Sequence, residues 1–250
     1  MNPITTERFA GFDGSELALH RVGQGRPVVL LHGLFSDAQT NWIRFGHAQR
    51  LAEAGFEAIM PDLRAHGQSA APHDPAAYPE DVLVKDAQAL IRHLDLQDYD
   101  LGGFSLGART AVRCVLQGLS PRRLALAGMG LEGLAGWSRR SAFFLDAIDR
   151  FDTVKHGDPA FMAVAFMKTQ KVDRVAARLL LQSVDDTEPG DLAGVTIPTL
   201  VVCGDRDRDN GSPEALAAAL PDARFEQIPG THMSSVTEPA LGEAIARFLA

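Results

Sequence analysis

Ser105 stands between two glycines in Gly103-Phe104-Ser105-Leu106-Gly107, which follows strand-forming residues and precedes helix-forming ones. A sharp turn from a strand into a helix exposes the residue at its apex, and glycines two positions away let the chain close there. The N-terminus of the following helix points at the serine and favours negative charge. We therefore interpret Ser105 as a nucleophile; the alternative is an ordinary turn between a strand and a helix.

A serine hydroxyl is a weak nucleophile near neutral pH and needs an adjacent base that a third group orients. His232 follows an expected strand in QIPGTHMSS, and Asp205, Asp207 and Asp209 follow another in LVVCGDRDRDNGSP. The carboxyl ends of parallel strands share one edge of a sheet, so these segments should lie on the same edge as Ser105. The pattern predicts His232 as the base and leaves the acid open among the three aspartates.

Strand and helix patterns alternate through most of the chain, which is typical of a mostly parallel sheet with helices on both faces. The expected strands are 16–22, 27–31, 56–60, 99–104, 124–129, 199–203 and 224–228. The expected helices are 38–54, 80–96, 105–117, 213–220 and 238–249. Residues 134–189 break this rhythm with three helix-like stretches near 139–150, 159–168 and 172–184. We predict a core of 1–133 and 190–250 and a helical cap of 134–189 over the site.

Composition and charge narrow the classes of partner. The chain has 250 residues and a formal net charge of −8, which opposes binding to nucleic acid and to anionic membranes. The short basic cluster Ser138-Arg139-Arg140 reads as a solvated helix face rather than an anion site. No apolar run is long enough for a membrane span, and the start lacks the pattern of a signal peptide. We expect a monomer or a small homo-oligomer with a small-molecule partner.

Cofactor and metal patterns are missing from the sequence. It contains no GxGxxG or phosphate-loop motif, and its histidines show no metal-ligand spacing. Its two cysteines, Cys114 and Cys203, lie in apolar surroundings and suggest neither a disulfide framework nor a zinc site. We therefore predict no cofactor, no metal and a cytoplasmic location.

Five landmarks occur in order: LLHGLF at 30–35, PDLRAHGQS at 61–69, GFSLG at 103–107, GDRD at 204–207 and PGTH at 229–232. Together they resemble the serine hydrolases of the α/β-hydrolase fold with a small helical cap, and the resemblance covers nearly the whole chain. It implies that Ser105 is the nucleophile and His232 the general base. It also implies that Asp207, three residues after the strand-end Gly204, is the acid, with Asp205 as the alternative.

The same resemblance implies an oxyanion hole made by the backbone N–H groups of Leu34 and Leu106. His32 is then expected to fix the loop that carries Leu34, and His66 to belong to loop architecture with Asp62. The family pattern usually has glycine where this chain has Ala65, for which we expect a small loop adjustment.

The resemblance implies an apolar substrate pocket under the cap. Its expected lining is Phe35, Trp137, Phe143, Phe144, Phe166 and Met233, with Phe161 and Met162 as further candidates; the alternative is that the cap residues only pack the cap onto the sheet. The serine nucleophile and the absence of an HGxP motif argue against epoxide hydrolases and haloalkane dehalogenases. An HGGG motif is also absent.

The implied activity is that of a cofactor-independent carboxylesterase acting on small to medium esters. A C–C bond hydrolase, a thioesterase, a lactonase or a perhydrolase would use the same groups. A non-catalytic ligand-binding protein of this fold is the alternative from another class.

Overall fold

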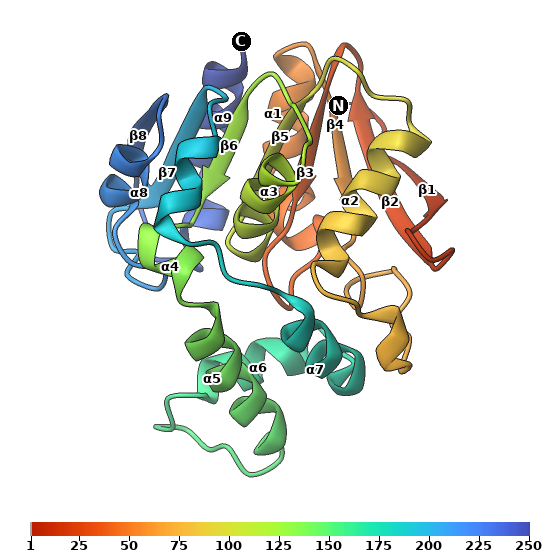
Figure 1. The fold of residues 1–250 in the computed structure, drawn as a ribbon, viewed down its shortest axis with the longest axis vertical. Coiled ribbons are helices and arrows are strands. Elements are labelled where there is room, and N and C mark those ends of the chain that lie inside the picture. The colour runs from red at the N-terminus through yellow and green to blue at the C-terminus, as the bar shows by residue number, and fades with distance from the viewer. Residues whose placement is uncertain (1) are drawn as a thin grey trace.

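The computed structural model describes residues 2–250, and within them eight strands form one sheet in the order β1-β2-β4-β3-β5-β6-β7-β8 (Figure 1). The strands are β1 (Thr5–Ala10), β2 (Glu16–Gly23), β3 (Arg26–Leu31), β4 (Phe56–Pro61), β5 (Asp100–Phe104), β6 (Leu124–Ala127), β7 (Thr199–Gly204) and β8 (Ala223–Ile228). Strands β3 to β8 pair in parallel, whereas β1 and β2 are antiparallel. The predicted mostly parallel sheet is confirmed.

The central strands are buried on both faces, which explains their continuous apolar sequences. Every residue of β5 and β7 is buried, whereas β1 at the edge of the sheet is almost wholly exposed. Strand β1 was not expected, because its sequence TTERFA is mostly polar and lacks the apolar run of a buried strand.

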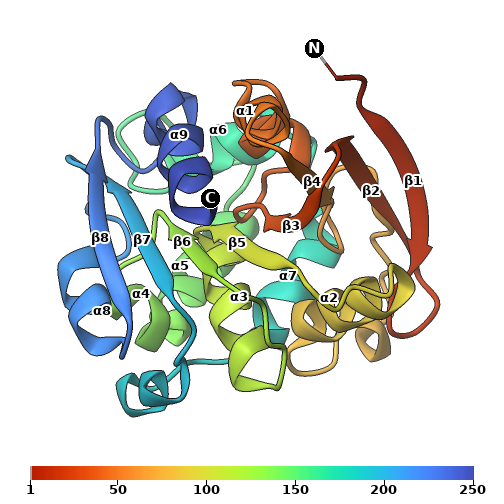
Figure 2. The ribbon, with the colours of Figure 1, turned by 90° about the horizontal axis from the view of Figure 1, so that it is seen from above.

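Two layers of helices cover the sheet, as the view from above shows (Figure 2). Helices α1 and α9 lie on one face, and α2, α3 and α8 lie on the other. Their bounds are α1 (His47–Glu53), α2 (Val82–His93), α3 (Leu106–Leu116), α8 (Pro213–Ala219) and α9 (Pro239–Leu249). The helix expected over 38–54 is divided into a π-helix (Gln39–Ile43) and α1, because Gly46 between them has a left-handed φ of 80°.

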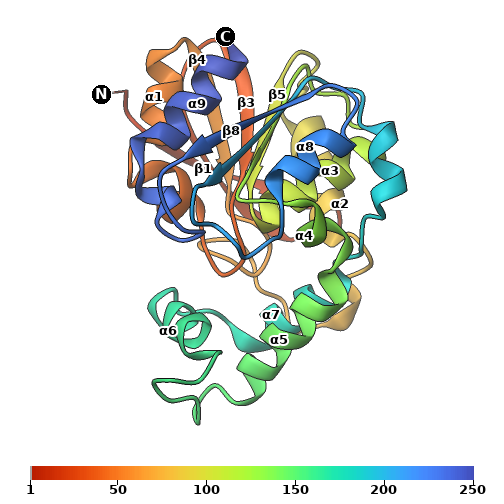
Figure 3. The same ribbon diagram turned by 90° about the vertical axis from the view of Figure 1, so that its left-hand side faces the viewer.

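Four helices lie between β6 and β7 and extend beyond the edge of the sheet (Figures 1 and 3). They are α4 (Leu131–Ala135), α5 (Trp137–Asp149), α6 (Phe161–Thr169) and α7 (Arg174–Ser183). The last three match the predicted helical stretches, whereas the short α4 was not expected. Short 3₁₀ turns occur at Pro75–Ala77, Pro189–Gly194 and Ser235–Thr237. No helix of residues 2–250 is long and apolar enough to cross a bilayer.

Arg109 of α3 connects both ends of this insertion to the core. Its buried guanidinium donates to the backbone oxygens of Gly133 at 2.6 Å and Asp185 at 2.7 Å, and it also donates to Leu134 O. One side chain thereby satisfies carbonyls at the start and at the end of the inserted segment. The helices beyond these two points are consequently anchored at their base.

The junction of β5 and α3 is tightly packed on both sides of Ser105. A methyl group on Gly103 would overlap the backbone of Gly107, and a methyl on Gly107 would overlap the carbonyl of Leu31 in β3. Ser105 itself has φ 54° and ψ −112°, a conformation that costs a non-glycine residue energy. The two glycines are thus required by contact with neighbouring backbone.

The loop after β3 is held by a frame of buried polar groups. Asp62 accepts hydrogen bonds from the N–H groups of Ala38 at 2.9 Å and Gln68 at 2.8 Å, and His20 Nε2 lies 3.3 Å from it. Burial alone raises the pKa of Asp62, but these hydrogen bonds and the nearby His32 lower it to about 2. The carboxylate therefore stays charged in the interior.

Two histidines complete the frame. His66 Nε2 accepts from Phe35 N–H at 2.9 Å, and His32 Nε2 accepts from Leu63 N–H at 2.9 Å. Burial lowers the pKa of His66 to about 3, so its ring stays neutral and keeps an acceptor for the backbone. Ala65 adopts a left-handed φ of 67°, so the loop keeps the backbone expected for glycine and the alanine carries the strain.

We predict that Gly107→Ala lowers the free energy of unfolding by about 3 kcal/mol, because the added methyl must displace backbone of β3. Urea unfolding measures the change. Gly190→Ala is the matched control, since its added methyl meets nothing within 4 Å, and it should change stability by less than about 1 kcal/mol. Equal effects of the two substitutions would contradict the packing argument.

We predict that Asp62→Asn lowers the free energy of unfolding by about 2 kcal/mol at pH 7. The pKa of Asp62 is depressed by folding, so its charge stabilises the protein above the unfolded pKa. That stabilisation is lost as the pH falls from about 4 to about 2, and the gap between parent and variant should shrink over this window. Urea unfolding from pH 7 downward measures it, with the exposed Asp98→Asn as control. A gap independent of pH would assign the loss to packing.

Candidate active site

Ser105, His232 and Asp207 form a hydrogen-bonded chain, although they come from three loops far apart in sequence. His232 Nε2 lies 3.1 Å from Ser105 Oγ, and His232 Nδ1 lies 2.9 Å from Asp207 Oδ2. Ser105 follows β5, Asp207 follows β7 and His232 follows β8, so the parallel register brings all three to the carboxyl edge of the sheet. All three residues are buried, which limits competition from water for these hydrogen bonds.

The position of Asp207 distinguishes it from the two neighbouring aspartates. Burial raises the pKa of Asp207, but the hydrogen bond and charge of His232 and the N–H of Asp209 outweigh burial and lower it. Asp205 instead accepts from Gly230 N–H at 2.8 Å and so braces the loop that carries His232. The geometry therefore brings Asp207, and not Asp205, to the imidazole.

Two backbone N–H groups near Ser105 are available as donors. Leu106 is the first residue of α3, where N–H groups lack partners within the helix. In the loop after β3, Gly33 N–H donates to Asn41 Oδ1 at 2.8 Å, and Phe35 N–H donates to His66. Leu34 N–H lies between them and donates to no acceptor within residues 2–250. The frame around Asp62 thus leaves Leu34 N–H free while its neighbours are bonded.

A cavity of about 1020 Å³ lies between this edge and the inserted helices, and Ser105 and His232 open into it. It is lined by every residue predicted for the pocket: Phe35, Trp137, Phe143, Phe144, Phe166 and Met233. The rings of Phe35, in the loop after β3, and Phe144, in α5, pack edge to face with their centroids 5.4 Å apart. Met162 also lines the cavity, whereas Phe161 packs against His156 at 5.2 Å and does not.

The cavity wall also carries charged residues that were not expected at the site. Arg140 is half-buried there, donates to Asp209 O and lies over the ring of Phe144 at 5.7 Å. Arg139 and Arg208 line the same cavity and are exposed. Arg139 is exposed, as a solvated face would be, although it also borders the cavity, whereas Arg140 is half-buried in the cavity wall. Short basic clusters give no sign of which member turns inward.

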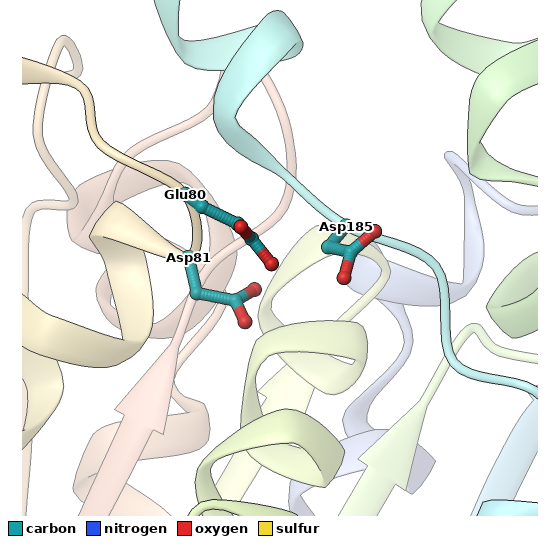
Figure 4. A group of neighbouring side chains, drawn as sticks. All are labelled: Glu80, Asp81 and Asp185. Atoms are coloured by element: carbon teal, nitrogen blue, oxygen red, sulfur yellow. The ribbon is translucent and has the colours of Figure 1, made fainter.

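Among residues 2–250, one group of acidic side chains is close enough to hold a cation: Glu80, Asp81 and Asp185 (Figure 4). Arg113 lies beside it, with Nε donating to Asp81 at 2.8 Å and Nη2 lying 3.3 Å from Asp185. A guanidinium already compensates the charge of two of these carboxylates.

Cys114 and Cys203 are free and buried, and burial raises the pKa of Cys203 to about 12, so its thiol is unreactive.

Known structures share this architecture. An esterase from Exiguobacterium antarcticum superposes with a TM-score of 0.77 over 97% of this chain and 99% of that chain, at 20% identity. At this identity the likeness shows the fold alone.

Two curated relatives align over most of the chain. The dihydrolipoyllysine-residue acetyltransferase component of the acetoin cleaving system of Pseudomonas putida is 31% identical over 228 residues, covering 80% of this chain and 58% of that protein. The chain thus spans little more than half of that relative's length. A non-heme haloperoxidase from Rhodococcus erythropolis is 26% identical over 87% of this chain and 89% of that protein.

The sequence profile of the alpha/beta hydrolase family matches residues 28–243. This range contains the junction at Ser105, the loop of Asp207 and the loop of His232, together with all the strands from β4 to β8. The chain belongs to the alpha/beta hydrolase family.

Proposed function

We propose that the chain is a cofactor-independent serine hydrolase that cleaves carboxylic esters of small to medium size. The observation that carries the proposal is the continuous chain of hydrogen bonds from Ser105 Oγ through His232 to Asp207. A nucleophile, a base and an orienting carboxylate in this arrangement are the parts that acyl transfer requires. Membership of the alpha/beta hydrolase family supports a hydrolase activity in general.

The first half of the reaction forms an acyl-enzyme. Ser105 Oγ attacks the ester carbonyl while His232 Nε2 takes the hydroxyl proton, and Asp207 stabilises the imidazolium that results. The tetrahedral oxyanion accepts hydrogen bonds from the backbone N–H groups of Leu34 and Leu106. Each donor of this kind lowers the activation free energy by about 3 kcal/mol. Collapse of the intermediate expels the alcohol, which takes its proton from His232.

The second half releases the acid. A water molecule replaces the alcohol, and His232 removes its proton as it attacks the acyl carbonyl. A second tetrahedral intermediate then collapses, His232 returns the proton to Ser105 Oγ, and the carboxylic acid leaves. No group beyond these residues and water is needed to balance the reaction.

The apolar lining of the cavity supports an ester with an apolar acyl or alkyl part. The same residues would serve a thioester, a lactone or a C–C bond substrate. The likeness to a non-heme haloperoxidase supports hydrogen peroxide as a second acceptor for the acyl group. A ligand-binding protein without catalysis remains the alternative from another class.

We predict that the chain hydrolyses 4-nitrophenyl esters and that Ser105→Ala abolishes turnover, because the variant lacks the hydroxyl that lies 3.1 Å from His232 Nε2. The release of 4-nitrophenol from a series of acyl chain lengths measures both the activity and the length that the pocket accepts. A fluorophosphonate probe should label the parent at Ser105 and leave the variant unlabelled.

Three results would separate the alternatives. Labelling without turnover of any ester would move the substrate to C–C, thioester, lactone or peroxide chemistry. Turnover that survives Ser105→Ala would contradict the assigned nucleophile. Absence of both labelling and turnover would favour the ligand-binding alternative.

We predict that Asp207→Asn lowers kcat by about 10³- to 10⁴-fold, since an amide no longer holds His232 in the productive tautomer. Asp205→Asn is the matched control, because an amide oxygen still accepts from Gly230 N–H, and it should cost less than about tenfold. Steady-state kinetics on the best ester measures both. A larger loss for Asp205→Asn than for Asp207→Asn would reverse the assignment of the acid.

A further inference from the structure

The charges around the cavity run against the charge of the whole chain. The chain has 24 Lys and Arg against 32 Asp and Glu. Its cavity wall instead carries five arginines and two acidic residues: Arg44, Arg109, Arg139, Arg140, Arg208, Glu132 and Asp209. A low-dielectric cleft lined by one sign of charge attracts a ligand of the opposite sign. The wall therefore favours an anionic substrate in an otherwise acidic protein.

The two acidic residues offset the positive charge of the cavity wall only in part. Glu132 accepts from Ser212 N–H at 2.8 Å and so serves the local backbone. Asp209 contributes its backbone oxygen to Arg140 and its N–H to Asp207, so its main chain is also engaged. The carboxylate of Asp209 remains near Arg140 and would repel a doubly charged ligand more than a singly charged one.

Four of the five arginines keep guanidinium donors for a ligand, although Arg140 and Arg208 each donate one hydrogen bond to a backbone carbonyl, that of Asp209 and that of Asp207. Arg109 is the exception, because its guanidinium is engaged by backbone carbonyls at both ends of the insertion. None of Arg44, Arg139, Arg140 and Arg208 has a carboxylate within 4.0 Å among the described residues. Other arginines among residues 2–250 are commonly paired with acidic side chains.

Arg140 is the best placed of the four. It is half-buried, whereas the other three are exposed, and Phe144 of the apolar wall flanks it. Its hydrogen bond to Asp209 O occupies one donor of a guanidinium that has five. Burial partly desolvates the Arg140 guanidinium and lowers its pKa, although the charges of Asp209 and Asp207 oppose this shift. A bound anion would compensate the partly desolvated charge.

We propose that the substrate is an ester that also bears a carboxylate, and that Arg140 binds this carboxylate while the ester carbonyl lies at Ser105. The inference rests on the proposed hydrolase function and adds a specificity residue to it. Phe143 and Phe166 line the same cavity and offer apolar surface to the chain that joins the two groups of the substrate. A carboxylate carries a single charge, which suits a site that has Asp209 beside the arginine.

The test compares two esters that differ only in the terminal group. Mono-4-nitrophenyl hexanedioate has a carboxylate where 4-nitrophenyl hexanoate has a methyl, and both release the same leaving group. We expect kcat/KM to favour the hexanedioate by about tenfold at low ionic strength, mainly through KM. The preference should weaken as salt is added, since part of the site is open to solvent.

Variants tie the preference to one residue. Arg140→Gln should bring the ratio of the two kcat/KM values towards one, and Arg140→Lys should give an intermediate ratio because it keeps the charge without the two-pronged geometry. Arg92→Gln, an exposed arginine of α2 away from the cavity, removes the same charge and should leave the ratio unchanged.

The outcomes distinguish the two proposals. Turnover of hexanoate without a preference for hexanedioate, or a preference that survives Arg140→Gln, overturns the carboxylate site and leaves the hydrolase. If Ser105 is labelled by fluorophosphonate but neither ester turns over, protection from labelling by monomethyl adipate, which carries one carboxylate, decides: protection in the parent but not in Arg140→Gln supports the site, and its absence overturns it. No turnover and no labelling removes the hydrolase, and the carboxylate site falls with it.

Discussion

The close approach of three backbone segments at Ser105 is the constraint on which the rest of the site depends. Gly103 and Gly107 allow β5, α3 and the end of β3 to meet without a side chain between them. This contact forces Ser105 into a left-handed φ of 54°, which raises its energy but lifts its hydroxyl towards His232. The surrounding sheet offsets the strain, because every residue of β5 is buried and residues 101–103 are paired with both β3 and β6.

A second group of strained and buried residues holds the loop after β3, on the other side of the site. Phe35 and Ala65 also have positive φ, and the two loops that contain them are joined by the hydrogen bond from Phe35 N–H to His66. Asp62 ties the same two loops together through its bonds to Ala38 and Gln68. The buried carboxylate of Asp62 does not line the cavity. Its effect is to fix which N–H groups are occupied and to leave that of Leu34 unoccupied.

Local patterns in the sequence predict most of the sheet and two residues of the hydrogen-bonded chain, Ser105 and His232, whereas Asp207 is implied by the family resemblance. Apolar runs ended by glycine, proline or aspartate locate the strands, and their parallel order puts Ser105 and His232 on one edge. The edge strand β1 is not predicted because its contact with solvent leaves its sequence polar. The break at Gly46 is not predicted because the helical periodicity continues across it. The choice between Asp205 and Asp207 depends on the fold of one loop, which spacing alone leaves open.

Arg140 marks the limit of sequence reasoning most clearly, since the orientation of α5 against the sheet decides whether it meets solvent or cavity. That orientation also sets how a bound anion affects the reacting groups. Arg140 lowers the pKa of Asp207, so neutralising its charge would weaken this effect. The hydrogen bond from His232 lowers the same pKa more strongly than Arg140 does. An anion bound at Arg140 would therefore weaken only the smaller of these two effects on Asp207, and the hydrogen bond that orients His232 does not involve Arg140.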